Sequence, residues 1–66
     1  MIIQLNGEPK DVPADWTVAA LIRDLGRDSR TVAVEFNRRI LAREAYSRTS
    51  LSPADQLEIV HFVQGG

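Results

Sequence analysis

The sequence predicts an α+β domain in which a single helix packs on one face of a mixed sheet of four or five strands. Three segments alternate between apolar and polar residues, as half-buried strands do: residues 2–6, 31–37 and 57–63. Residues 18–25 instead have the spacing of an amphipathic helix. A chain of 66 residues accommodates one domain, which we assign to residues 1–63, followed by a flexible tail of residues 64–66.

The first strand is expected to turn back in a hairpin. Asn6-Gly7 follows it, and both residues tolerate the positive φ of a type I′ turn. A weaker return strand is predicted over residues 10–12. Pro9 and Pro13 flank this segment, and because proline lacks a backbone N–H they favour an edge position in the sheet.

The helix has identifiable start and stop residues. Thr17 is the predicted N-cap, because its hydroxyl can accept a hydrogen bond from a free amide of the first turn. Gly26 occupies the C′ position, where glycine readily adopts the left-handed conformation that ends a helix. Between them the apolar residues fall at i, i+3, i+4 and i+7 and form one stripe: Val18, Leu21, Ile22 and Leu25.

The second half of the chain completes the sheet. Asn37-Arg38 is expected to connect the strand over 31–37 to a short strand at 40–41, and residues 43–52 read as irregular with one helical turn. Alternation and helical spacing assign the following residues to the core: Ile3, Leu5, Val12, Val18, Leu21, Ile22, Leu25, Val32, Val34, Phe36, Leu57 and Ile59. The other face of the sheet would carry Ile2, Ala33, Glu35, Glu58, Val60 and Phe62.

Three large apolar residues are thus predicted on the face that lacks a helix: Ile2, Val60 and Phe62. Two interpretations stay open. A small protein always exposes some apolar surface, but neighbouring apolar side chains also form docking sites for partner proteins.

Composition excludes several classes of function. The net charge of −1 argues against a broad nucleic-acid interface, and the absence of cysteine excludes disulfides and thiolate metal sites. Met1 leads directly into the first strand without a signal peptide or membrane span, so a cytoplasmic location is expected. His61 is the single histidine and has no clustered ligands, so no metal site is predicted. Without a nucleophile–base pair, a carboxylate pair or a phosphate loop, the chain is not expected to be an enzyme.

The terminal Gly65-Gly66 dipeptide points to chemistry at the end of the chain. It has no Cβ atoms, so it can enter a channel too narrow for other dipeptides. The terminal carboxylate is ionised at neutral pH and can attack a phosphorus centre such as the α-phosphate of ATP. The tail beyond Val63 reaches only about 10 Å when extended. The domain itself must therefore dock beside the channel, and Val60 and Phe62 share the terminal strand with the tail.

A basic stretch contains Arg38, Arg39, Arg43 and Arg48. Such a run is usually a solvated surface. The alternative is that it meets an acidic surface of a partner, which would speed association and make it depend on salt.

Taken together, "NGE", "TVAALIRDLG", "VAVEFN" and "LSPADQLEIVHFVQGG" resemble the ThiS family of sulfur carrier proteins over essentially the whole chain. The resemblance implies the β-grasp (ubiquitin-like) fold, with the first and last strands parallel at the centre of the sheet. Three positions depart from the family pattern. Ala42 stands in place of a proline, Tyr46 in place of a tryptophan, and "FNRR" in place of an Asn-Gly hairpin.

The resemblance also implies a mechanism. Gly66 would be adenylated by an E1-like (ThiF-like) enzyme that uses ATP and Mg²⁺, while the chain itself binds no cofactor. A sulfur donor such as a cysteine desulfurase or rhodanese would convert Gly66 to a thiocarboxylate, which passes its sulfur to a ThiG-like thiazole synthase. Gly65 and Gln64 would enter the active site with it, and the carrier would be a monomer when free. Two alternatives stay open: a sister carrier for molybdopterin or another sulfur-containing metabolite, and a ubiquitin-like modifier or binding domain.

Overall fold

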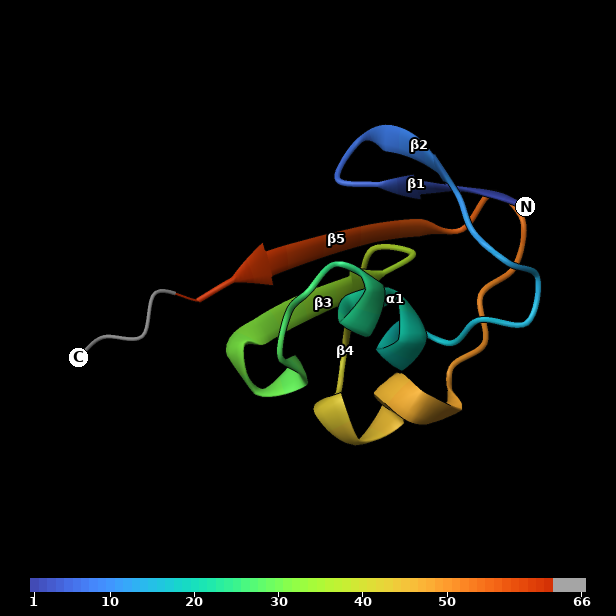
Figure 1. Cartoon of the computed structure of the whole chain (residues 1–66). Coiled ribbons are helices and arrows are strands. Elements are labelled where there is room, and N and C mark those ends of the chain that lie inside the picture. The colour runs from blue at the N-terminus through green and yellow to red at the C-terminus, as the bar shows by residue number, and fades with distance from the viewer. Residues whose placement is uncertain (63–66) are drawn as a thin grey trace.

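The computed structural model describes residues 1–62, which form a five-stranded mixed sheet with one α-helix (Figure 1). The elements in chain order are β1 (Ile2–Leu5), β2 (Glu8–Asp11), α1 (Val18–Asp24), the 3₁₀ helix η1 (Ser29–Thr31), β3 (Val32–Phe36), β4 (Arg39–Leu41), the 3₁₀ helix η2 (Arg43–Arg48) and β5 (Gln56–His61). The strand order is β2-β1-β5-β3-β4, and β5 runs parallel to β1 and antiparallel to β3. The predicted α+β class and the central parallel pair are confirmed. The tail, with Gln64, Gly65 and Gly66, lies outside the described residues.

Both hairpins close with two residues at positive φ. Asn6 and Gly7 have φ values of 52° and 82°, as predicted for a type I′ turn, and Asn37 and Arg38 have values of 50° and 72°. The predicted bounds of the return strand, residues 10–12, were wrong at both ends, because β2 begins at Glu8, includes Pro9 and ends at Asp11. Because β2 lies at the edge of the sheet, no further strand pairs with its outer side. The missing N–H of Pro9 therefore leaves no hydrogen bond of the sheet unmade.

Helix α1 begins and ends as predicted. The Thr17 hydroxyl accepts a hydrogen bond from the Ala20 amide at 3.2 Å. At the other end Gly26 has a φ of 72°, and the amides of Gly26 and Arg27 donate to the carbonyls of Arg23 and Ile22. These two bonds make a Schellman motif, which satisfies the carbonyls of Ile22 and Arg23 near the end of the helix.

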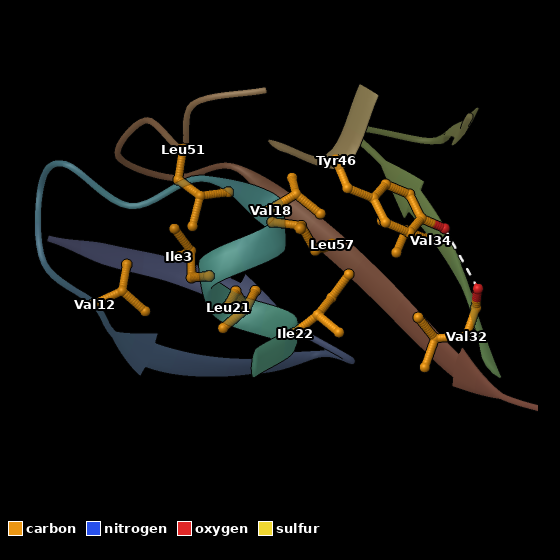
Figure 2. Packing of buried hydrophobic residues seen from close by; sticks show 10 residues of the cluster. All are labelled: Ile3, Val12, Val18, Leu21, Ile22, Val32, Val34, Tyr46, Leu51 and Leu57. Carbon is orange, nitrogen blue, oxygen red and sulfur yellow. Dashed lines mark hydrogen bonds between the residues drawn. The ribbon is translucent and has the colours of Figure 1, made fainter. Parts of the chain in front are cut away.

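The core lies between α1, η2 and the sheet (Figure 2). Of the twelve predicted residues, eight are buried and four are partly buried against them: Leu5, Leu25, Phe36 and Ile59. Sequence reasoning missed Tyr46 and Leu51, which are 5% and 4% exposed. Both belong to the segment that read as irregular. Helix η2 turns the Tyr46 ring inward, and the Leu51 amide donates to the Trp16 carbonyl at 2.9 Å.

The buried Tyr46 ring has one polar contact. Its hydroxyl donates to the Val32 carbonyl at 3.4 Å (Figure 2). Burial raises the pKa of this phenol, and the nearby positive charge of Arg43 acts in the opposite direction. Tyrosine therefore fills this core position as a neutral hydrogen-bonding group attached to β3.

Candidate functional site

The central strand β5 carries the chain toward its C-terminus. It lies between β1 and β3 and is the longest strand of the sheet (Figure 1). The Phe62 amide donates to the Thr31 carbonyl at 2.8 Å, so backbone hydrogen bonding continues one residue past the β3–β5 ladder, to the last described residue. The backbone of Phe62, the last described residue, is thus held by a hydrogen bond.

Two asparagines hold β5 from opposite sides. The Asn6 side-chain oxygen accepts from the Ile59 amide at 2.9 Å, and the Asn37 oxygen accepts from the Gln56 amide at 2.9 Å. The backbone amides of the same asparagines donate to carbonyls of β5, those of Leu57 and Gln56. Sequence reasoning assigned both residues to turns and missed these contacts. The only signal for them was that asparagine opens both turns.

The face of the sheet opposite α1 divides into a polar and an apolar part. Cross-strand register pairs Gln4 with Gln56 and Glu35 with Glu58. These four residues line a hollow of about 310 Å³ over the first half of β5, together with Gly7, Arg38 and Leu57. Toward the end of β5, register instead pairs Ala33 with Val60, whereas Ile40 lies across from Glu35, at the level of the polar part. The apolar part is therefore the one nearer to the tail.

The three predicted docking residues are exposed, but they are not all together. Val60 and Phe62 are 58% and 48% exposed and lie near the end of β5. Ile2 is 49% exposed, and its carbonyl accepts from the Ala54 amide, before β5 begins. Six residues of parallel strand therefore separate the level of Ile2 from Val60, which is about 20 Å. Their role in docking stays a prediction, and the geometry favours Val60 and Phe62 for contacts near the tail.

Sequence reasoning missed a further exposed residue, Ile40, of which 77% is accessible. It lines a second hollow, of about 280 Å³, which we call the β3–β4 groove. The groove is lined by Ser29, Arg30, Val32, Ala33, Val34, Ile40, Leu41, Arg43, Tyr46 and Phe62. It therefore reaches from the edge of the sheet to the last described residue.

Neither a metal site nor a membrane span occurs in the described part of the chain. No three His, Cys, Asp or Glu side chains of residues 1–62 could hold a metal ion together. His61 is exposed near the end of β5. Among these residues no helix has the length and apolar character needed to cross a membrane.

Several proteins of known name are similar to this chain in sequence. The sequence pattern of the ThiS family matches residues 3–66. A thiazole synthase of Paramagnetospirillum magneticum is 44% identical over 66 residues, covering all of this chain and 20% of that protein. A thiazole synthase of Magnetococcus marinus is 42% identical with the same coverage, so this chain spans about a fifth of the length of both relatives. The sulfur carrier protein ThiS of Bacillus subtilis is 36% identical, with 98% of this chain and all of the carrier covered.

A solved structure agrees with these sequence matches. The thiamine biosynthesis protein (ThiS) of Geobacter metallireducens superimposes with a TM-score of 0.84 at 32% identity, over the full length of both chains. The predicted β-grasp fold is thereby confirmed. Sequence pattern, full-length relative and fold agree, and the chain belongs to the ThiS family.

Proposed function

We propose that this chain is a sulfur carrier for thiazole synthesis in thiamine biosynthesis, and that the carboxyl group of Gly66 carries the sulfur. The observation behind the proposal is that the family match extends through Gly66, while a sulfur carrier protein is matched over its full length. The sequence contains no cysteine, so a persulfide on the carrier itself is impossible.

The chemistry needs two steps at one carboxyl group. In the first, a Gly66 carboxylate oxygen attacks the α-phosphorus of ATP and pyrophosphate leaves, which gives an acyl adenylate. In the second, a sulfur nucleophile such as hydrosulfide attacks the carbonyl carbon and expels AMP. The product is a thiocarboxylate whose sulfur can be passed on. An E1-like adenylating enzyme binds ATP and Mg²⁺ and provides the site for both steps.

A thiazole synthase is the proposed acceptor of the sulfur. Two proteins named thiazole synthase contain a segment similar to this whole chain as about a fifth of their length. A carrier covalently joined to its acceptor has a high effective concentration at the acceptor's active site. The same transfer between separate chains requires a docking surface.

That surface must lie close to the end of β5. Gly66 is four residues beyond Phe62, and four extended residues reach about 14 Å. An enzyme that acts on Gly66 therefore covers the surface around Phe62. The exposed apolar side chains of Val60 and Phe62 are the proposed contacts, because burying them on an enzyme removes apolar area from water.

Intact-protein mass spectrometry tests the proposal. The chain is incubated with a ThiF-like enzyme, ATP, Mg²⁺ and sulfide, and the expected result is a mass gain equal to replacing one oxygen by sulfur, located at Gly66. The matched control is the chain without Gly66, which should not gain sulfur. An unmodified wild-type chain, with an enzyme that is active on another carrier, would contradict the proposal. Isopeptide-linked adducts of Gly66 would favour a modifier instead.

A further inference from the structure

Although the net charge is −1, basic and acidic residues are concentrated in different parts of the sequence. Residues 29–48 contain five arginines and two glutamates, whereas the rest of the chain contains three basic and seven acidic residues. Segment 29–48 forms η1, β3, β4 and η2, which include the edge strand β4 (Figure 1). Of its arginines, Arg30 and Arg43 lie at this edge, whereas Arg38 lines the hollow over the first half of β5. This edge is the one that contains the β3–β4 groove.

The groove exists because β4 is short. The ladder between β3 and β4 starts at the hairpin and stops at the pair Val34–Leu41, so the first two residues of β3 have no strand beside them on this side. The Tyr46 hydroxyl bonds to the Val32 carbonyl there (Figure 2). The residues that line the groove are largely apolar and include Ile40, the most exposed large apolar residue of the described chain.

The two arginines in the groove differ in their partners. Arg30 forms an ion pair with Asp28 at 2.8 Å, and its Nε also donates to the same carboxylate. Arg43 takes part in none of the ion pairs found within residues 1–62. The charge of Arg43 helps to lower the pKa of the Asp28 carboxyl, but without an ion pair among the described residues the Arg43 guanidinium can still bind a carboxylate from another molecule.

The groove also lies within reach of the reactive end of the chain. Phe62 lines it, and Gly66 follows only four residues later, about 14 Å at full extension. If the proposed function holds, the enzyme that adenylates Gly66 must cover this part of the surface. A second copy of this chain is a poor occupant, because pairing two such edges would bring like charges together.

We propose, on the basis of the proposed function, that the β3–β4 groove receives an acidic, extended segment of the adenylating enzyme. A carboxylate of that segment pairs with Arg43, and an apolar side chain of it packs against Ile40 and Phe62. The simpler explanation of the arginines is that charge on an edge strand prevents aggregation. That explanation needs only charge of either sign, whereas docking needs positive charge at residue 43.

The test compares two charge reversals of equal size, Arg43→Glu in the groove and Arg48→Glu, which is exposed at the end of η2 and does not line the groove. Adenylation by a ThiF-like enzyme is measured against carrier concentration in about 0.05 M and about 0.5 M salt. In low salt we expect Arg43→Glu to raise KM about tenfold with kcat nearly unchanged, and this loss to shrink in high salt. Arg48→Glu should change KM less than about threefold, and Arg43→Lys should retain a KM close to that of the wild type.

The KM values distinguish failure of the docking proposal from failure of the proposed function. Equal KM values for the two reversals, or an unchanged KM for Arg43→Glu, would overturn the docking of an acidic segment while leaving the carrier function in place. A wild-type chain that is not adenylated at all would overturn the proposed function and this inference with it. Thermal unfolding of every variant identifies loss of fold, and Arg43→Gln, expected to give a smaller rise in KM, replaces the reversal if that variant unfolds.

Discussion

The two hairpin turns of the sheet have the same backbone geometry and different sequences. Asn6-Gly7 and Asn37-Arg38 both place two consecutive residues at positive φ between two-residue-linked strands. Asparagine tolerates this region, and glycine favours it, but arginine at a φ of 72° is strained by about 1 kcal/mol. The β1–β2 turn is therefore relaxed, while the β3–β4 turn holds a strained residue that adds positive charge at the edge of the sheet.

What the two turns share is more informative than how they differ. Each asparagine side chain accepts a hydrogen bond from a β5 amide, so both turns act on one strand from opposite sides. Because β5 is the last strand before residues 63–66, both turns hold the strand that precedes the end of the chain. The asparagines that form the two turns thus also hold a strand that is distant from them in the sequence.

The largest effect is expected from removing these side chains. Asn37→Gly keeps the positive φ but deletes the bonds to Gln56 and to the Asp55 carboxylate, and we expect the free energy of unfolding to fall by about 1–2 kcal/mol. Asn6→Gly should have a smaller effect, because its second bond, to the Ile59 carbonyl, is long at 3.4 Å. Urea unfolding measures both. Stability unchanged in both variants would show that the asparagines serve only the turn conformation.

The second residue of each turn offers a reciprocal test. A Cβ at Gly7 would meet no atom within 4 Å, so Gly7→Ala should lose only the backbone preference, about 1 kcal/mol. Arg38→Gly should act in the opposite direction and stabilise by about 0.5 kcal/mol, since relief of strain exceeds the added entropy of the unfolded chain. Thermal unfolding of the two single variants checks the signs. Destabilisation by Arg38→Gly would mean that the side chain makes contacts worth more than its strain.

The segments that follow the hairpins differ as well. Pro13 follows closely after β2, whereas Ala42 follows β4 with a φ of −67° and a ψ of 143°. Proline fits these angles, and the preceding residue is extended, as proline requires. We expect Ala42→Pro to raise the free energy of unfolding by about 0.5 kcal/mol by restricting the unfolded chain. A lower melting temperature for this variant would show that the Ala42 amide is needed.

Sequence patterns predicted the elements with regular periods and missed those without one. Alternation identified β1, β3 and β5, the two turns indicated the hairpin partners β2 and β4, and the residues Thr17 and Gly26 delimited the helix correctly. Residues 43–52 have neither a two-residue nor a 3.6-residue period, so the inward turn of Tyr46 in a 3₁₀ helix could not be read from them. Leu51 was missed for the same reason.

The candidate site could not be predicted in full, because the sequence does not determine the register between strands. Alternation tells which face a residue occupies but not how far along the sheet it lies. It predicted the exposure of Ile2, Val60 and Phe62, and it could not show that the parallel pairing of Gln4 with Gln56 separates the first from the others. The groove beside Arg43 also depends on where the β3–β4 ladder stops, which no short motif records.

The smallest effect is expected where a side chain bonds only its own turn. Asp28 accepts from the Arg30 amide at 2.9 Å and pairs with the Arg30 guanidinium, which lowers the pKa of the carboxyl from 3.8 to about 2. A carboxyl with a depressed pKa stabilises the fold above pH 3.8, and this contribution is lost as the pH falls toward 2. Because the Asp28 side chain is exposed to solvent, water and salt screen the pair and the contribution is small.

The variant Asp28→Asn isolates that contribution, since asparagine can still accept from the Arg30 amide but carries no charge. Above pH 5 the wild type should melt at a slightly higher temperature than the variant. The difference should shrink as the pH falls from 3.8 to about 2, and it should be smaller in high salt at every pH. Thermal unfolding at a series of pH values gives both curves. A difference that does not change with pH would show that Asp28 acts through its hydrogen bond to the turn and not through its charge.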